Sequence, residues 1–157
     1  MSLNLTDFRR FEKQINLKKV GIAGQKKIQQ ARVLIIGMGG IGCPLFTYLA
    51  SAGICNIGIV DHDKVEIGNL SRQILFNSSD LGKYKVVQAK SKISKVYKRI
   101  KIKIFKSKAS SKNIKSISKS YDIICDGTDN FETRYLINDY CKKNKKILIS
   151  AAISAFD

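Results

Sequence analysis

The sequence predicts an α/β fold, a Rossmann-like, doubly wound and mostly parallel sheet preceded by N-terminal helices. Two observations carry this prediction. Short apolar runs alternate along the chain with stretches of helical periodicity, which is typical of strand–helix–strand units. The first apolar run leads into the glycine-rich stretch GMGGIG (37–42) and then a helical pattern, as in the first turn of such a fold. We therefore expect a helical segment over 1–30 and a Rossmann-like domain over 31–157.

The predicted strands are short apolar runs bounded by polar residues or glycine. Four of them do not alternate, which suits parallel strands covered by helices on both faces. They are Val33–Ile36, Ile57–Val60, Ile123–Cys125 and Ile147–Ile149. A fifth run, KIKIFK (101–106), alternates apolar and basic residues. We expect it to form a more exposed strand near an edge of the sheet.

Helical periodicity fills most of the intervals between these runs. Residues 6–30 predict two helices separated near Val20–Gly21. Residues 43–52 predict a helix with Pro44 in its first turn and Gly53 at its C-cap. Apolar residues at helical spacing flank the 101–106 strand: Val86, Ala89, Ile93, Val96 and Ile100 before it, Ile114 and Ile117 after it. A last helix is expected over about 130–142, where Asp129 and Glu132 fit a capping box.

Composition and charge narrow the class of protein. The chain has 157 residues, 44% of them hydrophobic, and a formal net charge of +17. No apolar run reaches the roughly 18 residues of a membrane-spanning helix, and the N-terminus lacks an apolar signal core. We therefore expect a cytoplasmic protein without a membrane partner. The four cysteines are widely spaced and form no C-x-x-C pair, which argues against a disulfide framework and against a zinc site in this chain.

The positive charge is concentrated between Gly82 and Tyr121, where thirteen lysines and one arginine occur without an acidic residue. Such a block can attract RNA, an acidic protein or anionic lipid. Lysine is a diffuse charge, whereas specific phosphate recognition prefers arginine forks. Aromatic residues, on which single-stranded bases would stack, are also sparse in the block. The favoured interpretation is a solvated lysine-rich face, with RNA binding as the alternative.

Residues suited to binding a nucleotide follow the first two predicted strands. The glycines of the first turn are Gly37, Gly39, Gly40 and Gly42. Glycine allows backbone N–H groups at a helix N-terminus to approach phosphate closely. Asp61 ends the second strand, 24 residues after Gly37, where an acid accepts hydrogen bonds from ribose hydroxyls. The structural alternatives are a tight turn without ligand for the glycines and a strand-end turn for Asp61.

A polar cluster after the second strand separates two classes of nucleotide enzyme. It comprises Asn69, Arg72 and Gln73, with Lys85 on the next helix. Asp63, which precedes the cluster, is a candidate for binding metal or substrate. Attack at the α-phosphorus of ATP places charge on the phosphates, and Arg and Lys donors stabilise that charge. An NAD(P)-dependent oxidoreductase would use the glycines and Asp61 but leaves most of this cluster without a role. A solvated basic face is the structural alternative, and Asp63 alone is equally well a turn residue.

Two further residues complete the candidate set. Asp129 follows the third buried strand, and its hard oxygen ligands suit Mg²⁺; the capping box is the structural alternative. His62 is the only histidine, so no Ser-His or Cys-His nucleophile pair has independent support. We expect His62 to be a surface residue.

Four stretches in this order, LIIGMGGIG, DHDKVEIGNLSRQ, GKYKV and DGTDN, closely resemble the ThiF/MoeB/HesA family, relatives of ubiquitin-activating enzymes. The likeness runs from about Phe11 to the last residue. It implies ATP-dependent adenylation, the transfer of AMP to the C-terminal carboxylate of a small ubiquitin-like sulfur-carrier protein ending in Gly-Gly, as in molybdopterin or thiamin biosynthesis. Within the same family, the alternatives are a peptide-adenylating enzyme and a cyclising dehydratase that acts on tRNA.

The resemblance also implies roles for the site residues. The four glycines form the phosphate loop, Asp61 binds the ribose, and Asp129 holds Mg²⁺. The groups around the phosphates are Asn69, Arg72, Gln73 and Lys85. Of these, Arg72 and Lys85 stabilise the transition state. The carboxylate substrate supplies the nucleophile, so adenylation requires no catalytic serine or cysteine.

Two departures from the family pattern bear on assembly. Lys13 stands where the family often has an arginine that reaches into the ATP site of the partner subunit in a homodimer, and Arg10 is the neighbouring alternative. The family's C-terminal portion, which often carries a zinc site, does not follow the last predicted strand. We therefore expect residues 31–157 to be an incomplete ATP-binding (adenylation) domain that is inactive or poorly dimerised on its own, and a non-catalytic interaction domain is a further alternative.

Overall fold

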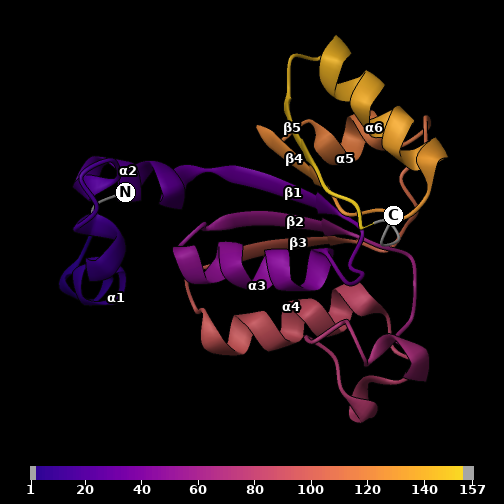
Figure 1. Ribbon diagram of the computed structural model, residues 1–157, viewed down its shortest axis with the longest axis horizontal. Coiled ribbons are helices and arrows are strands. Elements are labelled where there is room, and N and C mark those ends of the chain that lie inside the picture. Colours follow the sequence, from indigo (N-terminus) through magenta and orange to yellow (C-terminus); the bar gives the residue numbers. More distant parts are fainter. Residues whose placement is uncertain (1–2, 154–157) are drawn as a thin grey trace.

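The computed structural model describes residues 3–153 and confirms the predicted α/β class (Figure 1). Five parallel strands form one sheet in the order β3-β2-β1-β4-β5. They are β1 (Arg32–Ile36), β2 (Asn56–Val60), β3 (Lys101–Phe105), β4 (Ile123–Asp126) and β5 (Ile147–Ser150). The strand order changes direction between β1 and β4. In open sheets of this kind, ligands bind at the carboxyl ends of the strands near that switch point.

Helices cover both faces of the sheet (Figure 1). One face carries α3 (Gly42–Ala52) and α4 (Lys85–Val96), and the other carries α5 (Ile114–Ser118) and α6 (Phe131–Lys143). The helices α1 (Leu5–Ile15) and α2 (Gly21–Gln30) lie beyond the N-terminal ends of the strands. Two short 3₁₀ turns, η1 (Ile67–Asn69) and η2 (Ser78–Asp80), lie between β2 and α4. Within residues 3–153, no helix has the length and apolar character needed to cross a membrane.

The core consists of one apolar cluster on each side of the sheet. In β1, Val33 and Ile35 pack toward α3 and α4, whereas Leu34 and Ile36 pack toward α5 and α6. All four side chains are at most 2% exposed. Burial on both faces explains why this strand reads as an unbroken apolar run. The cysteines contribute to the packing, since Cys43, Cys125 and Cys141 are buried and Cys55 is half-buried, all as free thiols.

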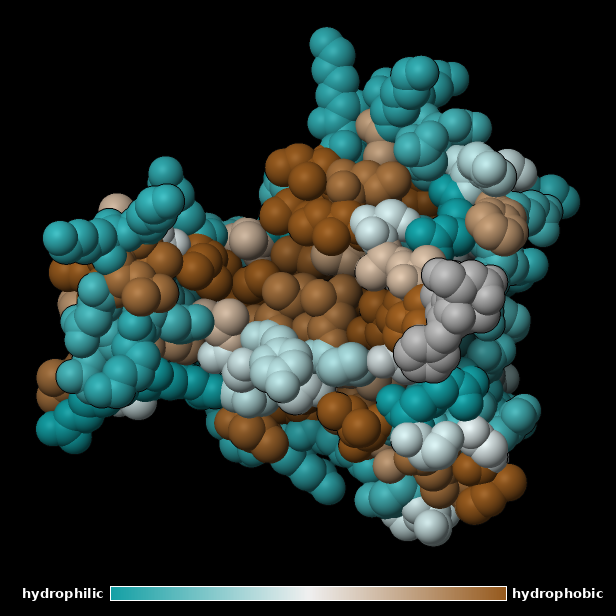
Figure 2. Space-filling model, in the orientation of Figure 1, coloured by the Kyte–Doolittle hydropathy of each residue, from teal (hydrophilic) through white to brown (hydrophobic). Residues whose placement is uncertain are grey.

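The two edge strands differ from each other, and the prediction was correct for only one. β3 lies at an edge and alternates exposed and buried residues, as expected. β5 was expected to be covered on both faces, but it forms the opposite edge, and Ile147 and Ile149 are 58% and 56% exposed. No helix among the described residues covers β5 on the face of the sheet that carries α3 and α4. Figure 2 shows the apolar side chains gathered there, between α3 and α6.

Helix boundaries differ from the predictions in three places. The two N-terminal helices are separated by residues 16–20, so the break begins before Val20. Helix α4 ends at Val96, which is 64% exposed, and leaves Ile100 outside the helix. The capping box of Asp129 and Glu132, given as the structural alternative for Asp129, does not form, because Asn130 is the N-cap of α6 and its Oδ1 accepts a hydrogen bond from Thr133 N at 2.9 Å. The end of the predicted domain, 154–157, lies outside the described residues.

Candidate active site

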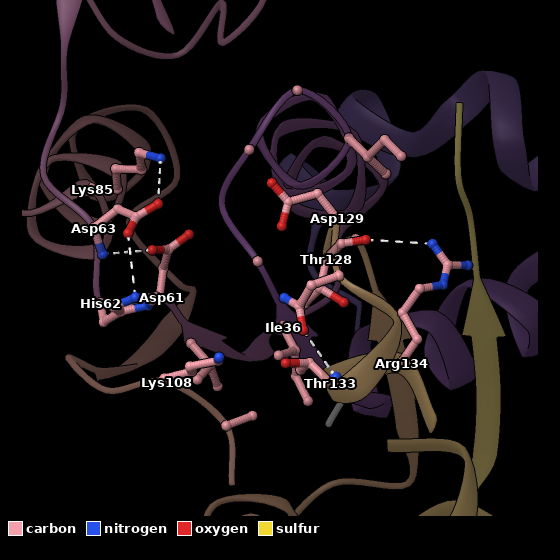
Figure 3. Close-up of a pocket in the computed structure, with 18 of the residues that line it drawn as sticks. Ile36, Asp61, His62, Asp63, Lys85, Lys108, Thr128, Asp129, Thr133 and Arg134 are labelled. Atoms are coloured by element: carbon pink, nitrogen blue, oxygen red, sulfur yellow. Dashed lines mark hydrogen bonds and ion pairs between the residues drawn. The ribbon is translucent and has the colours of Figure 1, made fainter. Parts of the chain in front are cut away.

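A cavity of about 920 Å³ opens at the carboxyl ends of the strands (Figure 3). Its walls are the glycine loop after β1, the segment between β2 and α4, the loop after β3 and the loop 127–130 after β4. Ten predicted site residues line it: Gly37, Gly39, Gly40, Asp61, Asp63, Asn69, Arg72, Gln73, Lys85 and Asp129. Residues from distant parts of the chain therefore meet at the switch point, as the fold predicts.

Packing requires two of the four glycines in the glycine loop, Gly37 and Gly42. Gly37 has φ +93°, and a Cβ there would lie 2.9 Å from the carbonyl oxygen of Gly127. A Cβ on Gly42, which is buried beneath the loop, would lie 1.9 Å from the carbonyl oxygen of Gly37. By contrast, a Cβ on Gly39 would meet nothing within 4 Å. The space beside Gly39 therefore remains open to a group that approaches the backbone.

Helix α3 begins directly after this loop without a side-chain cap. In its first turn Cys43 N donates to Gly39 O at 3.0 Å and Pro44 has no N–H, so Gly42 N is left without an acceptor within residues 3–153. A helix N-terminus of this kind favours an anion. The open space beside Gly39 lies at the same turn, so this part of the cavity suits a phosphate group.

Asp61 connects the end of β2 to the glycine loop. Its Oδ2 accepts a hydrogen bond from Met38 N at 2.6 Å, and its Oδ1 accepts one from Asp63 N at 2.7 Å. The residue is 9% exposed and lines the cavity. An ionised carboxylate has about four acceptor positions. Asp61 therefore retains capacity for a hydroxyl donor while its orientation is held by two backbone amides.

Lys85 is the most enclosed cation of the site. It is the first residue of α4 and is 5% exposed. Its Nζ lies 3.0 Å from Oδ2 of Asp63 (Figure 3). An unpaired buried ammonium is strongly unfavourable, so Asp63 acts here as the counterion of Lys85. His62 is exposed, as expected, and its Nε2 lies 3.5 Å from Oδ1 of Asp63.

Arg72 lies beside the glycine loop and lines the cavity. The alkyl part of its side chain packs near Gly40, where a Cβ would lie 3.5 Å from the Arg72 Cγ and Cδ atoms. Nη1 donates to Gly68 O at 3.0 Å. A guanidinium has five N–H donors, and this is its one hydrogen bond within residues 3–153. The remaining donors are available to a ligand in the cavity.

Two amide side chains of the same segment have different surroundings. Asn69 Oδ1 accepts a hydrogen bond from Glu66 N at 3.3 Å, so this amide is engaged in the local turn. Gln73 is 2% exposed, yet its Oε1 has no hydrogen-bond partner among the described residues. Buried polar atoms in native proteins are nearly always paired with protein or water. An unpaired one at a cavity wall indicates a ligand or water position.

Asp129 is exposed at the tip of the loop 127–130. Within residues 3–153 its carboxylate makes no hydrogen bond or ion pair. Figure 3 shows it directed toward the side of the cavity that carries Asp61 and Asp63. Because Asn130 caps α6, the carboxylate of Asp129 is not engaged by the helix. It is available to a cation.

The comparison with known sequences agrees with this geometry. Residues 11–157 match the ThiF family. The chain belongs to the ThiF family. The family resemblance predicted from the four motifs is thus confirmed.

Two curated relatives show how the ThiF-family chain compares with longer proteins. The probable molybdopterin-synthase adenylyltransferase of Porphyra purpurea is 42% identical over 154 residues, covering 98% of this chain and 40% of the relative. The sulfur carrier protein adenylyltransferase of Thermus thermophilus is 36% identical over 148 residues, covering 94% of this chain and 55% of the relative. The chain therefore spans about half the length of these relatives, or less.

A solved structure confirms the fold. The ATP complex of E. coli tRNA N6-threonylcarbamoyladenosine dehydratase, TcdA, superimposes with a TM-score of 0.87 and 23% sequence identity. The match covers 100% of this chain and 65% of that one. At this identity the likeness extends to the fold.

The thiols of the ThiF-family chain are not placed to act as nucleophiles in this cavity. Burial raises the pKa of the Cys43 thiol to about 12, against a smaller opposing effect of Lys85. Its Sγ donates to Met38 O at 3.3 Å. A thiol with such a pKa stays protonated near neutral pH. Cys43 is therefore a packing residue at the start of α3.

One predicted site residue, Lys13, lies away from the cavity of the same chain. Lys13 is exposed on α1, at the opposite end of the sheet (Figure 1). Arg10, its proposed alternative, stacks over the ring of Tyr97, with the guanidinium carbon 4.5 Å from the ring centroid. Neither side chain therefore reaches the site in cis. A role for Lys13 requires a second subunit.

Two further cavity residues, Lys108 and Arg134, were not expected from the sequence. Lys108 belongs to the loop after β3, and its Nζ lies 3.9 Å from Oε2 of Glu132. Among thirteen lysines in that block, no local pattern singles it out. Arg134 lies one helical turn after Asn130, so its position behind the DGTDN stretch was the only available signal.

Proposed function

We propose that this chain provides the ATP-binding part of an enzyme that transfers AMP from ATP to the C-terminal carboxylate of a ubiquitin-like sulfur-carrier protein ending in Gly-Gly. One observation carries the proposal: the open glycine loop, the acid Asp61, two cations and a free carboxylate line the same cavity. Membership of the ThiF family and the names of the two adenylyltransferase relatives support it.

The reaction follows from the chemistry of these side chains. The carrier's carboxylate oxygen attacks the α-phosphorus of ATP, an acyl–adenylate bond forms, and the bond to pyrophosphate breaks. Negative charge increases on the α-phosphate oxygens and on the leaving group. The free donors of Arg72 and the ammonium of Lys85 stabilise this charge. The glycine loop, Asn69 and Gln73 position the phosphates, and Asp61 orients the ribose.

Lys85 changes partners in this scheme. In the free chain its charge is balanced by Asp63. A phosphate oxygen in the cavity offers a second anion at the same end of the side chain. Holding Lys85 in place before ATP binds reduces the conformational entropy lost on binding. The same pairing explains why a buried lysine is tolerated in the free protein.

The residues of the β4 loop fit a magnesium ion. Mg²⁺ is commonly held by one or two carboxylates together with substrate phosphates, and Asp129 offers a free carboxylate at the cavity. When bound there, Mg²⁺ neutralises charge on the phosphates. Asp129 is the residue of this chain that would hold it.

Calorimetric titration of the chain with Mg·ATP and separately with NAD⁺ tests the proposal. We expect Mg·ATP to bind and NAD⁺ to give no heat of binding. Binding of NAD⁺ with ATP silent would instead favour an oxidoreductase and remove the roles of Arg72, Lys85 and Asp129. Where ATP binds, a carrier protein ending in Gly-Gly should release pyrophosphate, and nucleotide binding without release would favour a non-catalytic domain.

A tRNA acceptor is the second candidate, favoured by the lysine-rich block. Three of its thirteen lysines form ion pairs: Lys85, Lys92 and Lys108. The others form none within residues 3–153. If tRNA is the acceptor, its affinity should fall steeply with salt, since each phosphate contact releases counterions. An affinity for tRNA that does not change with salt would indicate that the block is a solvated face.

Assembly and location complete the proposal. A homodimer would bring Lys13 to a partner's ATP site, and Lys13 keeps the positive charge but lacks the planar fork of arginine. The free cysteines fit a reducing compartment. We therefore place the protein in the cytoplasm.

A further inference from the structure

A hydrogen-bond network behind the cavity joins β4, the loop 127–130 and β5. At its centre is Asp126, the last residue of β4, which is 2% exposed. Its Oδ1 accepts hydrogen bonds from Thr128 N at 3.0 Å and Thr128 Oγ1 at 2.7 Å. Its Oδ2 accepts one from Ser150 Oγ at 2.8 Å. A buried carboxylate needs such partners because an unpaired one would be strongly unfavourable.

Arg134 closes this network from α6. Nη1 donates to Thr128 O at 3.3 Å and to Ala151 O at 3.1 Å, and Nη2 donates to Ser150 Oγ at 2.7 Å. Nε lies 3.7 Å from Oδ2 of Asp126 and supplies the opposite charge. Figure 3 shows the contact between Arg134 and Thr128. The planar guanidinium reaches several acceptors at once, which an ammonium group does not.

The two acids of the DGTDN stretch therefore have different surroundings. Both oxygens of Asp126 are engaged by the network. Asp129, three residues later, has no such contact within residues 3–153. The chain on either side of Asp129 is nevertheless held, since Arg134 binds the carbonyl of Thr128 and the side chain of Asn130 caps α6.

We propose that Arg134 is a positioning residue that holds the loop 127–130 so that the Asp129 carboxylate faces the phosphate region of the cavity. The inference rests on the proposed function, because it concerns the Mg²⁺-dependent part of ATP binding. Arg134 acts through Thr128 and Asp126 and in this role does not contact the nucleoside. Its removal consequently affects Mg·ATP and spares AMP.

The test uses Arg134→Met, which keeps the alkyl chain and removes the guanidinium. We expect the gain in ATP affinity on adding Mg²⁺ to fall by about 10- to 100-fold, the usual effect of losing a group that orients a metal ligand. The affinity for AMP should remain within about twofold, well under the tenfold that corresponds to 1.4 kcal/mol. Amide hydrogen exchange in the nucleotide-free chain should accelerate at Thr128, whose N–H donates to Asp126.

Arg32→Met is the matched control. Arg32 is likewise paired with an aspartate, donating to Asp122 at 2.7 and 2.6 Å, but at the N-terminal end of β1. Its loss should change neither the Mg²⁺-dependent gain nor exchange at Thr128. Arg134→Lys restores the charge without the fork and should recover only part of the gain. If Arg134→Met fails to fold, Ser150→Ala provides a milder change, since it removes one acceptor of Arg134 and one donor to Asp126.

Two results would overturn the inference. In the first, Arg134→Met or Ser150→Ala keeps the full Mg²⁺-dependent gain and the exchange rate of Thr128. In the second, Arg134→Met weakens AMP as much as Mg·ATP, which would make Arg134 a direct nucleotide contact. Failure of the unaltered chain to bind ATP contradicts the proposed function itself and is therefore distinguishable, because exchange at Thr128 is measured without nucleotide.

Discussion

The two ends of the sheet differ in which polar groups are left for a ligand. At the N-terminal end two arginines are paired with acids, Arg32 with Asp122 and Arg99 with the buried Asp7, whereas Lys85 and Arg134 are the paired cations of the carboxyl end. At the carboxyl end, Arg72 keeps free donors, and neither Asp129 nor the Oε1 of Gln73 has a partner within residues 3–153. Unpaired polar atoms also occur at the N-terminal end, at Oε1 of Gln25 and Gln29 on α2. At the carboxyl end, by contrast, the unpaired groups line one cavity.

The glycines show the same contrast. A Cβ on Gly53, at the end of α3, would lie 2.7 Å from Cζ of Phe11, and one on Gly58 would lie 2.4 Å from Oη of Tyr121. Packing of this protein explains both. Gly39 faces open space and has no such reason in the free chain. The candidate functional end is therefore marked by the convergence of Gly39, Arg72, Gln73 and Asp129 on one cavity.

Loss of Arg72 should give the largest effect, because its free donors belong to the functional end. We expect Arg72→Ala to lower the adenylation rate by about 10²–10³-fold and to weaken ATP far more than AMP. Pyrophosphate release with a carrier protein and the two nucleotide affinities measure this. Arg32→Ala, which breaks an ion pair at the N-terminal end of the sheet, should leave all three values unchanged. Equal losses for ATP and AMP with Arg72→Ala would remove this residue from the phosphate site.

Asp129 and Asn130 are adjacent, but Asn130 caps α6, whereas Asp129 is the proposed Mg²⁺ ligand. Asp129→Ala should abolish the Mg²⁺-dependent gain in ATP affinity and leave the free energy of unfolding unchanged. Asn130→Ala should lower the free energy of unfolding by about 1 kcal/mol through loss of the cap. Titration with and without Mg²⁺, together with urea unfolding, separates the two. A destabilised Asp129→Ala with normal Mg²⁺ dependence would contradict the assignment.

The glycine loop offers a second adjacent pair. Gly42→Ala should lower the free energy of unfolding by about 1–3 kcal/mol, because the new methyl group would overlap the carbonyl of Gly37. Gly39→Ala should unfold at the same urea concentration as the unaltered chain but bind ATP more weakly, since the methyl group occupies the open space. Unchanged ATP binding in Gly39→Ala would mean that phosphate does not approach this position.

The smallest effect should come from breaking the ion pair of Arg99 with Asp7 at the N-terminal end of the sheet, and it should depend on pH. Burial alone would raise the pKa of Asp7, but hydrogen bonds from Arg99 and from the Asn4 backbone outweigh it, so this pKa lies below its ordinary value of 3.8. A depressed pKa adds stability above the unfolded-state pKa, and this stability is lost as pH falls through the folded-state pKa. Arg99→Met should therefore destabilise the chain at neutral pH by about 1–2 kcal/mol and lessen the loss of stability below about pH 4.

Urea unfolding between pH 2 and pH 7 measures that change. The pKa values of Asp80 and Asp122 are also lowered by neighbouring cations, so the variant should keep part of the acid dependence. An identical pH profile in Arg99→Met and the unaltered chain would show that the pair with Asp7 contributes nothing to stability.

The sequence alone determined the fold class, four of the five strand environments and ten of the residues that line the cavity. These depend on local patterns: an unbroken apolar run for β1, alternation for β3, and a glycine, Gly37, at a positive φ that other residues rarely adopt. The four motifs identified the family for the same reason, since each is a contiguous stretch with its own spacing.

Tertiary structure decided whatever depends on partners distant in the chain. Ile147–Ile149 has the composition of a buried strand, yet it lies at an edge because burial depends on what packs against it. The sequence DGTDN does not reveal that Asp126 accepts a hydrogen bond from Ser150 or that Asn130 caps α6. Nor does it reveal that the Asp129 carboxylate has no partner within residues 3–153. Arg134 and Ser150 lie 8 and 24 residues beyond Asp126. Only the pairing of β4 with β5 and the packing of α6 bring these side chains within hydrogen-bonding distance.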